Sequence, residues 1–370
     1  MKVMKQGQQR LFETDAETAA VVTRMLIDLE KNGMDAVRQY SRKFDDWDPP
    51  SFRLSEAEIR EGIAKVPEQG IRDTDFCQGN VRKFAEAQFK TMLPLEVELR
   101  PGVILGHKHI PVNSVGSYIP GGRYPMFGSA QMSIIPAKVA GVKHIAACTP
   151  PVKGQGYYPA TINAIKKAGA DAIYILGGVP ALALMAFGLD GLPPVDVLCG
   201  AGNRFVAEAK RQLFGRCGID LLAGPTEIFS WRDQGIVYVA SNAEEAIRLS
   251  DNYAPEHLEL HVRDVDFYFS RLTNYGSLFI GEETTVAYGD KTIGTNHILP
   301  TSRAARYTGG VWVGKFLKTC TYQRMTPEAS VEIGEVTERQ CNLENMLAHG
   351  ITARVRVERY GALATRGTSK

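Results

Sequence analysis

Strand-like apolar runs alternate with helical segments along the middle of the chain, and this alternation restricts the fold more than any other feature. The runs cover residues 144–148, 172–176, 195–199 and 219–222. The helical segments cover residues 130–140, 160–168, 181–187 and 204–214. Alternation at this spacing indicates right-handed crossovers between parallel strands, with helices on the faces of the sheet. The sequence therefore predicts an α/β fold.

Glycine-rich turns follow the predicted strands. They are Gly177-Gly178, Gly200-Ala201-Gly202 and Gly224-Pro225. Open parallel sheets bind ligands beyond the carboxyl ends of their strands, where glycine lets the backbone come close to a cofactor. The turn at Gly200 follows a strand and opens a helix, as a dinucleotide fingerprint does. However, Phe205 occupies the third glycine position, and no acidic residue ends a following strand at the required distance. We expect a sheet able to bind a nucleotide without the standard fingerprint.

A carboxylate and an imidazole stand side by side directly after a proline, at Pro255-Glu256-His257. Proline fixes its own φ and biases Ala254 toward extended geometry, so a rigid corner is predicted there. Residues 258–262 then alternate apolar and polar side chains, as a half-buried strand does. Glu and His move protons near neutral pH. On chemistry alone, a surface pair at a strand start is the simpler interpretation.

Length and composition set the class of protein. A chain of 370 residues predicts two domains with extensions. The net charge of +2 gives no reason to expect nucleic acid or a membrane surface as a partner. The six cysteines are scattered without a Cys-x-x-Cys pair, which favours reduced thiols in a cytoplasmic protein. No signal peptide is expected at the N-terminus, and no apolar run is long enough to span a bilayer.

The flanks of the α/β region have other patterns. Residues 14–66 are predicted to be helical with a break at Gly33, and residues 71–89 form a long amphipathic segment of the kind that packs against another subunit. Residues 97–110 predict a β-hairpin in which His107 and His109 share a face. Two histidines alone are a weak metal signal, and a structural role is the favoured interpretation. The C-terminus predicts a helical segment followed by a basic strand or arm at residues 354–359, which docks on the body or on a partner chain.

Several segments, in the same order along the chain, resemble the histidinol dehydrogenase family. They are residues 118–122, 135–142, 218–227, 253–258 and 294–301, and the Ala348-His349 tail. Two details look less like the biosynthetic histidinol enzyme: residues 123–125 follow the glycine pair with a shorter loop, and residues 307–318 resemble the paralogues that oxidise sulfopropanediol. The resemblance covers nearly the whole chain.

The resemblance implies a fold and an assembly. The family has two Rossmann-like domains with parallel sheets and forms homodimers with intertwined tails. We therefore expect a helical N-terminal region with the first segment of a discontinuous α/β domain at residues 1–117. A nucleotide-binding domain follows at 118–224, the second segment of the first domain at 225–325, and a dimerisation tail at 326–370.

The resemblance also implies an activity and its residues. The family oxidises a primary alcohol through an aldehyde to a carboxylate in two NAD-dependent steps. His257 would be the base for the alcohol proton, and Glu256 would activate the water that hydrates the aldehyde. The remaining positions match cofactor contacts (Tyr118, Asn203), substrate contacts (Thr226, His297, Glu344) and zinc ligands (Asp290, His349).

Two departures from the family pattern bear on function. Pro180 stands where the family has a cofactor-contacting glutamine. After Trp231 the chain runs directly into a strand, whereas the family continues through a helical stretch that carries a Gln and a His of the zinc site. No histidine lies between Thr226 and His257. Because two protein ligands rarely hold zinc tightly, we expect zinc binding to be weakened or lost.

Three functions remain open at this level. The first is oxidation of a sulfopropanediol-like alcohol, the second is oxidation of histidinol, and the third is a non-catalytic family member whose metal site has decayed. Arg303 and Arg306 are candidates for reading a sulfonate, although a solvated helix face is the favoured interpretation. The missing segment also predicts exposed apolar surface near Ile228 and Ile236 and a tendency to aggregate.

Overall fold

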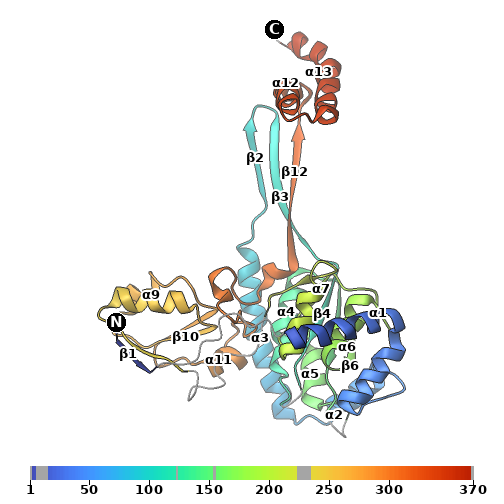
Figure 1. Ribbon diagram of the computed structural model, residues 1–370, viewed down its shortest axis with the longest axis vertical. Coiled ribbons are helices and arrows are strands. Elements are labelled where there is room, and N and C mark those ends of the chain that lie inside the picture. The colour runs from blue at the N-terminus through green and yellow to red at the C-terminus, as the bar shows by residue number, and fades with distance from the viewer. Residues whose placement is uncertain (1, 6–15, 122–123, 153–155, 223–234, 368–370) are drawn as a thin grey trace. The chain divides into compact units, whose positions relative to one another are not determined.

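The computed structural model describes residues 2–5, 16–121, 124–152, 156–222 and 235–367 (Figure 1). The chain divides into two compact units. Unit 1 comprises Met1–Lys90 with Pro111–Phe316, and unit 2 comprises Thr91–Ile110 with Leu317–Lys370. The domain boundaries expected from the family resemblance stay predictions.

A five-stranded parallel sheet forms the centre of unit 1, as the alternation predicted. Its strand order is β6-β5-β4-β7-β8. The strands are β4 (Ser114–Tyr118), β5 (His144–Thr149), β6 (Ala172–Ile175), β7 (Val197–Cys199) and β8 (Gly218–Ile219). The strand order reverses at β4, because the chain first adds β5 and β6 on one side and then β7 and β8 on the other. The carboxyl ends of β4 and β7 therefore flank the switch point where such sheets bind ligands.

Two groups of helices pack among themselves around this sheet. One group contains α2 (Glu56–Ala64), α3 (Glu68–Lys90), α4 (Gly128–Ala140) and α5 (Pro159–Ala168). The other contains α1 (Ala16–Asp45), α6 (Gly178–Phe187) and α7 (Arg204–Leu213). The predicted break in the first helix is confirmed, since Gly33 has φ 55° and ψ −131° inside α1. At the start of α2, Ser55 and Glu58 form a reciprocal capping box.

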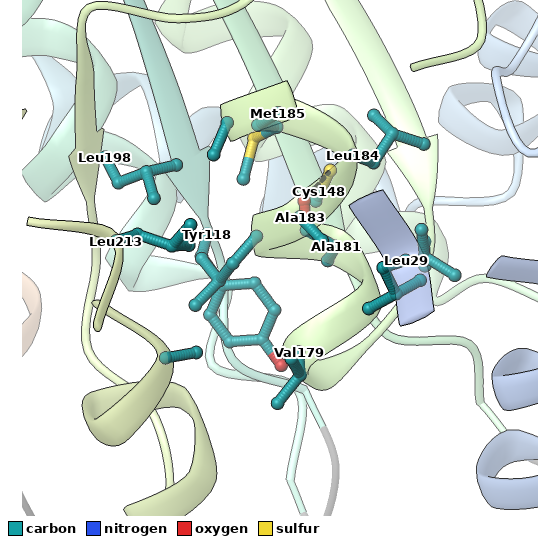
Figure 2. Packing of buried hydrophobic residues seen from close by; sticks show 14 of the residues in the cluster. Leu29, Tyr118, Cys148, Val179, Ala181, Ala183, Leu184, Met185, Leu198 and Leu213 are labelled. Carbon is teal, nitrogen blue, oxygen red and sulfur yellow. Dashed lines mark hydrogen bonds between the residues drawn. The ribbon is translucent and has the colours of Figure 1, made fainter. Parts of the chain in front are cut away.

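A dense apolar core lies beneath α1 and α6. Leu29 of α1, Leu184 and Met185 of α6, and Leu198 of β7 are all fully buried, and Figure 2 shows them in the same apolar cluster as Tyr118. The helix α6 is apolar on all sides because it is covered on every face. Truncation of a leucine in such a core costs about 2–5 kcal/mol.

The rest of unit 1 contains smaller elements. They are β1 (Lys2–Lys5) antiparallel to β9 (Val237–Val239), β10 (His257–Leu260) parallel to β11 (Ser277–Ile280), α9 (Ala243–Tyr253), α10 (Val265–Phe269), α11 (Val286–Lys291), and the 3-10 turns η1 (Ala304–Arg306) and η2 (Val313–Phe316). The succession β10-α10-β11 is a parallel crossover. The α/β class with parallel sheets is thus confirmed in both parts of unit 1.

Unit 2 combines a three-stranded sheet with a helical hairpin. The sheet order is β12-β3-β2, formed by β12 (Leu317–Met325), β3 (Val103–Pro111) and β2 (Leu95–Arg100), and the helices are α12 (Pro327–Leu343) and α13 (Leu347–Gly367). The predicted hairpin is confirmed as the antiparallel pair of β2 and β3. The basic stretch at residues 354–359, expected to be a strand or an arm, is helical, so the strand alternative is wrong. Across the described residues, no helix is long and apolar enough to cross a membrane.

Candidate active site

The corner that carries Glu256 and His257 has a different backbone from the one predicted. Ala254, expected to be extended, adopts the left-handed conformation with φ 51° and ψ 63°. The reason is that Ala254 ends α9 as its C-cap, with its N–H donating to the carbonyl of Ser250 at 2.8 Å. Helix termination therefore outweighs the bias that a following proline imposes. The resulting sharp turn delivers Glu256 directly to the start of β10.

The two side chains of the corner face each other. His257 Nδ1 lies 3.7 Å from Glu256 Oε2, and His257 Nε2 lies 4.0 Å from Asp290 Oδ1 of α11. The side chains of Glu256 and His257 are 8% and 11% exposed, whereas that of Asp290 is 34% exposed. The Phe279 ring of β11 stacks on the imidazole with a centroid separation of 6.0 Å. Two acid–base groups are thus held in one mostly buried place, which supports the functional interpretation over a surface pair.

The environment of His257 favours the neutral imidazole. Burial lowers the pKa of His257, and the carboxylates of Asp290 and Glu259 oppose that shift only in part. A neutral imidazole can accept a proton, which a catalytic base must do. The geometry and the charge state therefore agree with a proton acceptor at His257.

A hydrogen-bonded chain connects His297 to the sheet half of unit 1. The Nδ1 of His297 lies 2.8 Å from the carbonyl oxygen of Asp290, which can only accept, so Nδ1 carries the proton and donates. The Nε2 of His297 accepts from the hydroxyl of Ser129 on α4 at 2.9 Å. The Asn296 amide donates to the carbonyl of Met132 at 2.6 Å. Burial lowers the pKa of His297. Because protein groups occupy both ring nitrogens, His297 here aligns Asp290 and α4 with each other.

Tyr118, a predicted cofactor position, lies at the carboxyl edge of the five-stranded sheet beside the Gly200 turn. Tyr118 ends β4 and is 5% exposed, and its hydroxyl accepts the N–H of Gly178 at 3.1 Å. Burial raises the pKa of Tyr118 to about 12. A Cβ on Gly200, which has φ 128°, would lie 2.2 Å from the Tyr118 carbonyl oxygen. Only glycine fits at this close approach of β4 and β7.

The Gly200 turn leads into α7, where Asn203 is the N-cap. The Asn203 side chain accepts from the N–H groups of Phe205 and Val206 at 3.0 and 3.1 Å. Beneath the turn, the buried ammonium of Lys210 donates to the Gly200 carbonyl and pairs with Asp220. Asp220 in turn accepts the N–H of Gly200 at 2.8 Å. The backbone of this turn is therefore held from below by a buried ion pair.

The other predicted site residues lie outside the described residues or belong to unit 2. Thr226 lies outside the described residues. Glu344 and His349 belong to unit 2, where Glu344 is the C-cap of α12 and His349 lies in the first turn of α13, both exposed. Among the described residues, no three His, Cys, Asp or Glu side chains gather as a metal site. His107 and His109 have ring centroids 5.1 Å apart, and His109 contacts Thr319 and the Leu93 carbonyl.

The two arginine candidates differ from each other. Arg303 donates through Nη2 to the Asn252 carbonyl near the end of α9, while its buried Nε has no hydrogen-bond partner among the described groups. Arg306 is exposed and donates to the Arg303 carbonyl at 3.2 Å. Arg303 thus lies near the Glu256–His257 corner, whereas Arg306 fits the solvated surface position that was the favoured interpretation of both arginines.

Sequence reasoning missed Ser129 and the other polar residues of α4. Ser129, Gln131 and Ser133 are nearly fully buried in an otherwise apolar helix, and Gln131 donates to the Lys291 carbonyl at 3.0 Å. Buried polar side chains need partners, so polar residues at alternate positions in an apolar helix were the available signal. Ser129 and Gln131 bond His297 and the end of α11, whereas Ser133 bonds Ser117 of β4.

Known proteins resemble this chain along nearly its whole length. The family model for histidinol dehydrogenase matches residues 8–233 and 229–357. A histidinol dehydrogenase homolog from Shouchella clausii (strain KSM-K16) is 46% identical over 420 residues, covering 97% of this chain and 99% of that protein. The sulfopropanediol 3-dehydrogenase of Ruegeria pomeroyi (strain ATCC 700808 / DSM 15171 / DSS-3) is 42% identical over 407 residues, covering 93% of each chain. The crystal structure of histidinol dehydrogenase from Elizabethkingia anophelis matches with a TM-score of 0.87 at 27% identity, covering 96% of this chain and 95% of that one.

The fold and the site define an α/β enzyme of the NAD-dependent dehydrogenase class. The chain belongs to the histidinol dehydrogenase family. The two parts of the family match meet at residues 229–233, and the alignment with the S. clausii relative spans 420 positions although this chain has 370 residues. The relative therefore carries residues without a counterpart here, and the junction lies where the sequence predicted the missing segment.

Proposed function

We propose that this protein oxidises a small primary alcohol to a carboxylate through an aldehyde, using two molecules of NAD. The observation that carries the proposal is the buried Glu256–His257 pair, with 3.7 Å between Oε2 and Nδ1, beside Asp290. Two groups that accept protons are what a two-step oxidation requires, since the alcohol and the attacking water each lose one.

In the first step, His257 accepts the hydroxyl proton as the carbon–hydrogen bond of the alcohol carbon breaks. NAD, when bound, supplies the acceptor of the hydride in both oxidations. The lowered pKa of His257 keeps the imidazole neutral and able to accept this proton near neutral pH. His297 and Ser129 support the step by fixing Asp290 beside the imidazole.

In the second step, Glu256 removes a proton from the water that attacks the aldehyde carbon, while the protonated His257 returns its proton to the aldehyde oxygen, which gives the neutral hydrate. His257 then accepts a hydroxyl proton of the hydrate as the second carbon–hydrogen bond breaks, and the carboxylate results. One alcohol, one water and two NAD give one carboxylate, two NADH and three protons. The shielding of Glu256 limits competition from bulk water.

The described residues fit NAD better than zinc. Tyr118 and Asn203 would hold NAD at the switch point, where glycine lets β4 and β7 approach closely. Zinc sites take three or four protein ligands, whereas the proposed set contains only Asp290 and His349. The proposed reaction therefore has no step that needs zinc, and we expect isothermal titration to find weak zinc binding. One tight zinc per subunit that is abolished by His349→Ala would contradict this expectation.

We propose a sulfopropanediol-like substrate, supported by the 42% identity to the sulfopropanediol 3-dehydrogenase of R. pomeroyi. A sulfonate is negatively charged at all relevant pH values, and Arg303 near the corner has an unsatisfied buried donor suited to such oxygens. NADH formation with a sulfonated propanediol and with histidinol would separate the two substrate classes. Turnover of histidinol alone would contradict the substrate assignment, and no turnover of any primary alcohol would favour a non-catalytic family member.

The catalytic pair has a matched control on the same strand. His257→Asn is expected to block the first oxidation, and Glu256→Gln is expected to slow mainly the oxidation of added aldehyde, each by about 10²–10⁴-fold. Glu259 and His261 form a second Glu–His pair with the same 3.7 Å separation, but these side chains are 43% and 50% exposed. His261→Asn should leave both rates unchanged, and Glu259→Gln, which removes one of the two charges that oppose the lowered pKa of His257, should change them far less than either catalytic substitution. Equal losses from the two pairs would refute the assignment.

We also propose a homodimer in which unit 2 forms part of the interface. Within the described part of unit 2, the only buried apolar residues are Ala329, Cys341 and Ala353. Leu99, Leu343 and Leu347 are each more than 60% exposed. Apolar surface of this extent without a core of its own is typical of an interface. Light scattering at micromolar concentration should show a dimer, and a monomer would contradict the proposal.

A further inference from the structure

The sequence offered no acidic residue at the distance expected for a dinucleotide site, but the fold supplies one from outside the sheet. Asp45 is the last residue of α1, far from the sheet in sequence. The segment after it is anchored to the carboxyl end of β6, since the Trp47 indole donates to the Ile175 carbonyl at 3.0 Å. The Ile175 N–H in turn donates to the Phe52 carbonyl at 2.8 Å. The chain after α1 is thus fixed at the ligand-binding edge.

The carboxylate of Asp45 lies directly against the turn that follows β6. A Cβ on Gly177 would lie 2.8 Å from Asp45 Oδ2 and 2.9 Å from Pro150 Cβ, so glycine is required there. The next residue, Gly178, donates its N–H to the Tyr118 hydroxyl at 3.1 Å. The charge of Asp45 also acts on Tyr118, contributing to its raised pKa after burial. Asp45 and Tyr118 therefore share one end of the site.

Nothing in the described packing satisfies this carboxylate. Asp45 is half-buried, burial raises its pKa, and no described donor lies within hydrogen-bonding distance of it. A negative charge at a helix C-terminus also opposes the helix dipole, and the preceding Arg42 and Lys43 have the favoured sign. By contrast, the nearby Asp48 is paired with Arg38 and Arg42 at 2.6 and 2.9 Å. A half-buried carboxylate without a protein donor has acceptor capacity for a ligand.

We propose that Asp45 accepts hydrogen bonds from ribose hydroxyl groups of the nicotinamide cofactor and thereby selects NAD over its 2′-phosphorylated form. Carboxylate oxygens accept from a ribose diol, whereas a phosphate in the same place would meet a like charge. The inference rests on the proposed use of NAD. In a standard fingerprint an acidic residue at the end of a strand binds the ribose hydroxyl groups. Here Asp45, at the end of α1, would bind them instead.

The test is direct binding of NADH and NADPH to the full-length protein, measured by fluorescence titration without substrate. Asp45→Asn should weaken NADH binding by about tenfold or more, because the bonds lose a charged acceptor. The same substitution should leave NADPH binding unchanged or strengthen it, so the preference for NADH falls. Gly177→Ala should act in the same direction, since its methyl group would displace the carboxylate while its charge remains.

Asp46→Asn is the matched control, because Asp46 is the exposed neighbour in the left-handed region (φ 52°), which Asn tolerates. It should bind both cofactors as the parent does. Unchanged NADH affinity in Asp45→Asn would overturn the inference. An equal loss of NADH and NADPH would also overturn it, because Asp45 would then merely hold the edge together. Failure of the parent to bind either cofactor would instead refute the proposed function, and the inference with it.

Discussion

Lys210→Met is expected to lower the free energy of unfolding strongly, because it breaks a buried ion pair. The side chains of Lys210 and Asp220 are 2% and 0% exposed, and the two form an ion pair beneath the Gly200 turn. Methionine preserves the length of the chain but leaves the carboxylate buried without its counter-ion. Asp220 would keep the N–H groups of Gly200 and Leu221, at 2.8 and 2.7 Å, and the Cys199 side chain as partners, all of them uncharged. The Gly200 carbonyl would also lose the ammonium at 2.8 Å.

Breaking one side of a buried ion pair costs about 3–5 kcal/mol, which is a large part of the 5–15 kcal/mol typical of a domain. We expect the free energy of unfolding to fall by about that amount in Lys210→Met, and similarly in Asp220→Asn, which leaves the ammonium unpaired. The double variant contains no buried charge, so its loss should be smaller than the sum of the two single losses by about 0.5–3 kcal/mol.

Urea titration followed by circular dichroism measures all four free energies. Lys138→Met is the matched control, because Lys138 pairs with Asp171 at 2.8 Å near the surface, with side chains 23% and 46% exposed. It should cost no more than about 1 kcal/mol. The reasoning would be refuted if Lys210→Met cost no more than Lys138→Met, or if the losses in the double variant were additive.

Three further predictions follow from single positions. The free energy of unfolding should fall by roughly 1.4 kcal/mol per pH unit between pH 10 and about pH 12, because the folded state keeps the Tyr118 proton that the unfolded chain releases near pH 10.0. Urea titrations at a series of pH values measure this slope, and Tyr118→Phe should remove the part of it that Tyr118 contributes. Ser129→Ala should lower stability by about 1–3 kcal/mol by leaving the buried His297 Nε2 unpaired, and an unchanged urea midpoint would contradict that. Gly33→Ala should cost on the order of 1–3 kcal/mol from backbone strain alone, since no atom lies within 4 Å of the added methyl group; thermal melts check this.

Local patterns in the sequence determined most of the secondary structure in the α/β half. The four predicted strands and four predicted helices correspond to β5–β8 and α4–α7, with ends that differ by a few residues. The reason is that hydrophobic period and turn glycines act over short distances, so they are readable without knowing the packing. The same holds for the break at Gly33 and for the hairpin of β2 and β3.

The site depended partly on such local signals and partly on long-range packing. Glu256 and His257 are adjacent in the sequence, so their pairing was readable, but the conformation of Ala254 was not, since helix termination and the proline preference compete there. Ser129 and His297 are 168 residues apart in the sequence, and no local sequence pattern at either residue predicts their contact.

Tertiary structure alone decided the acidic residue at the nucleotide edge. A fingerprint search looks along the sheet, whereas Asp45 comes from the end of α1 and reaches Gly177 only through the packing of α1 against α6. Lys210 and Asp220 likewise lie in different elements and meet only beneath the Gly200 turn. Sequence periodicity determines which elements form, because it reports which face of each element avoids water. Which polar groups then face each other depends on how those elements pack, and that is a property of the whole fold.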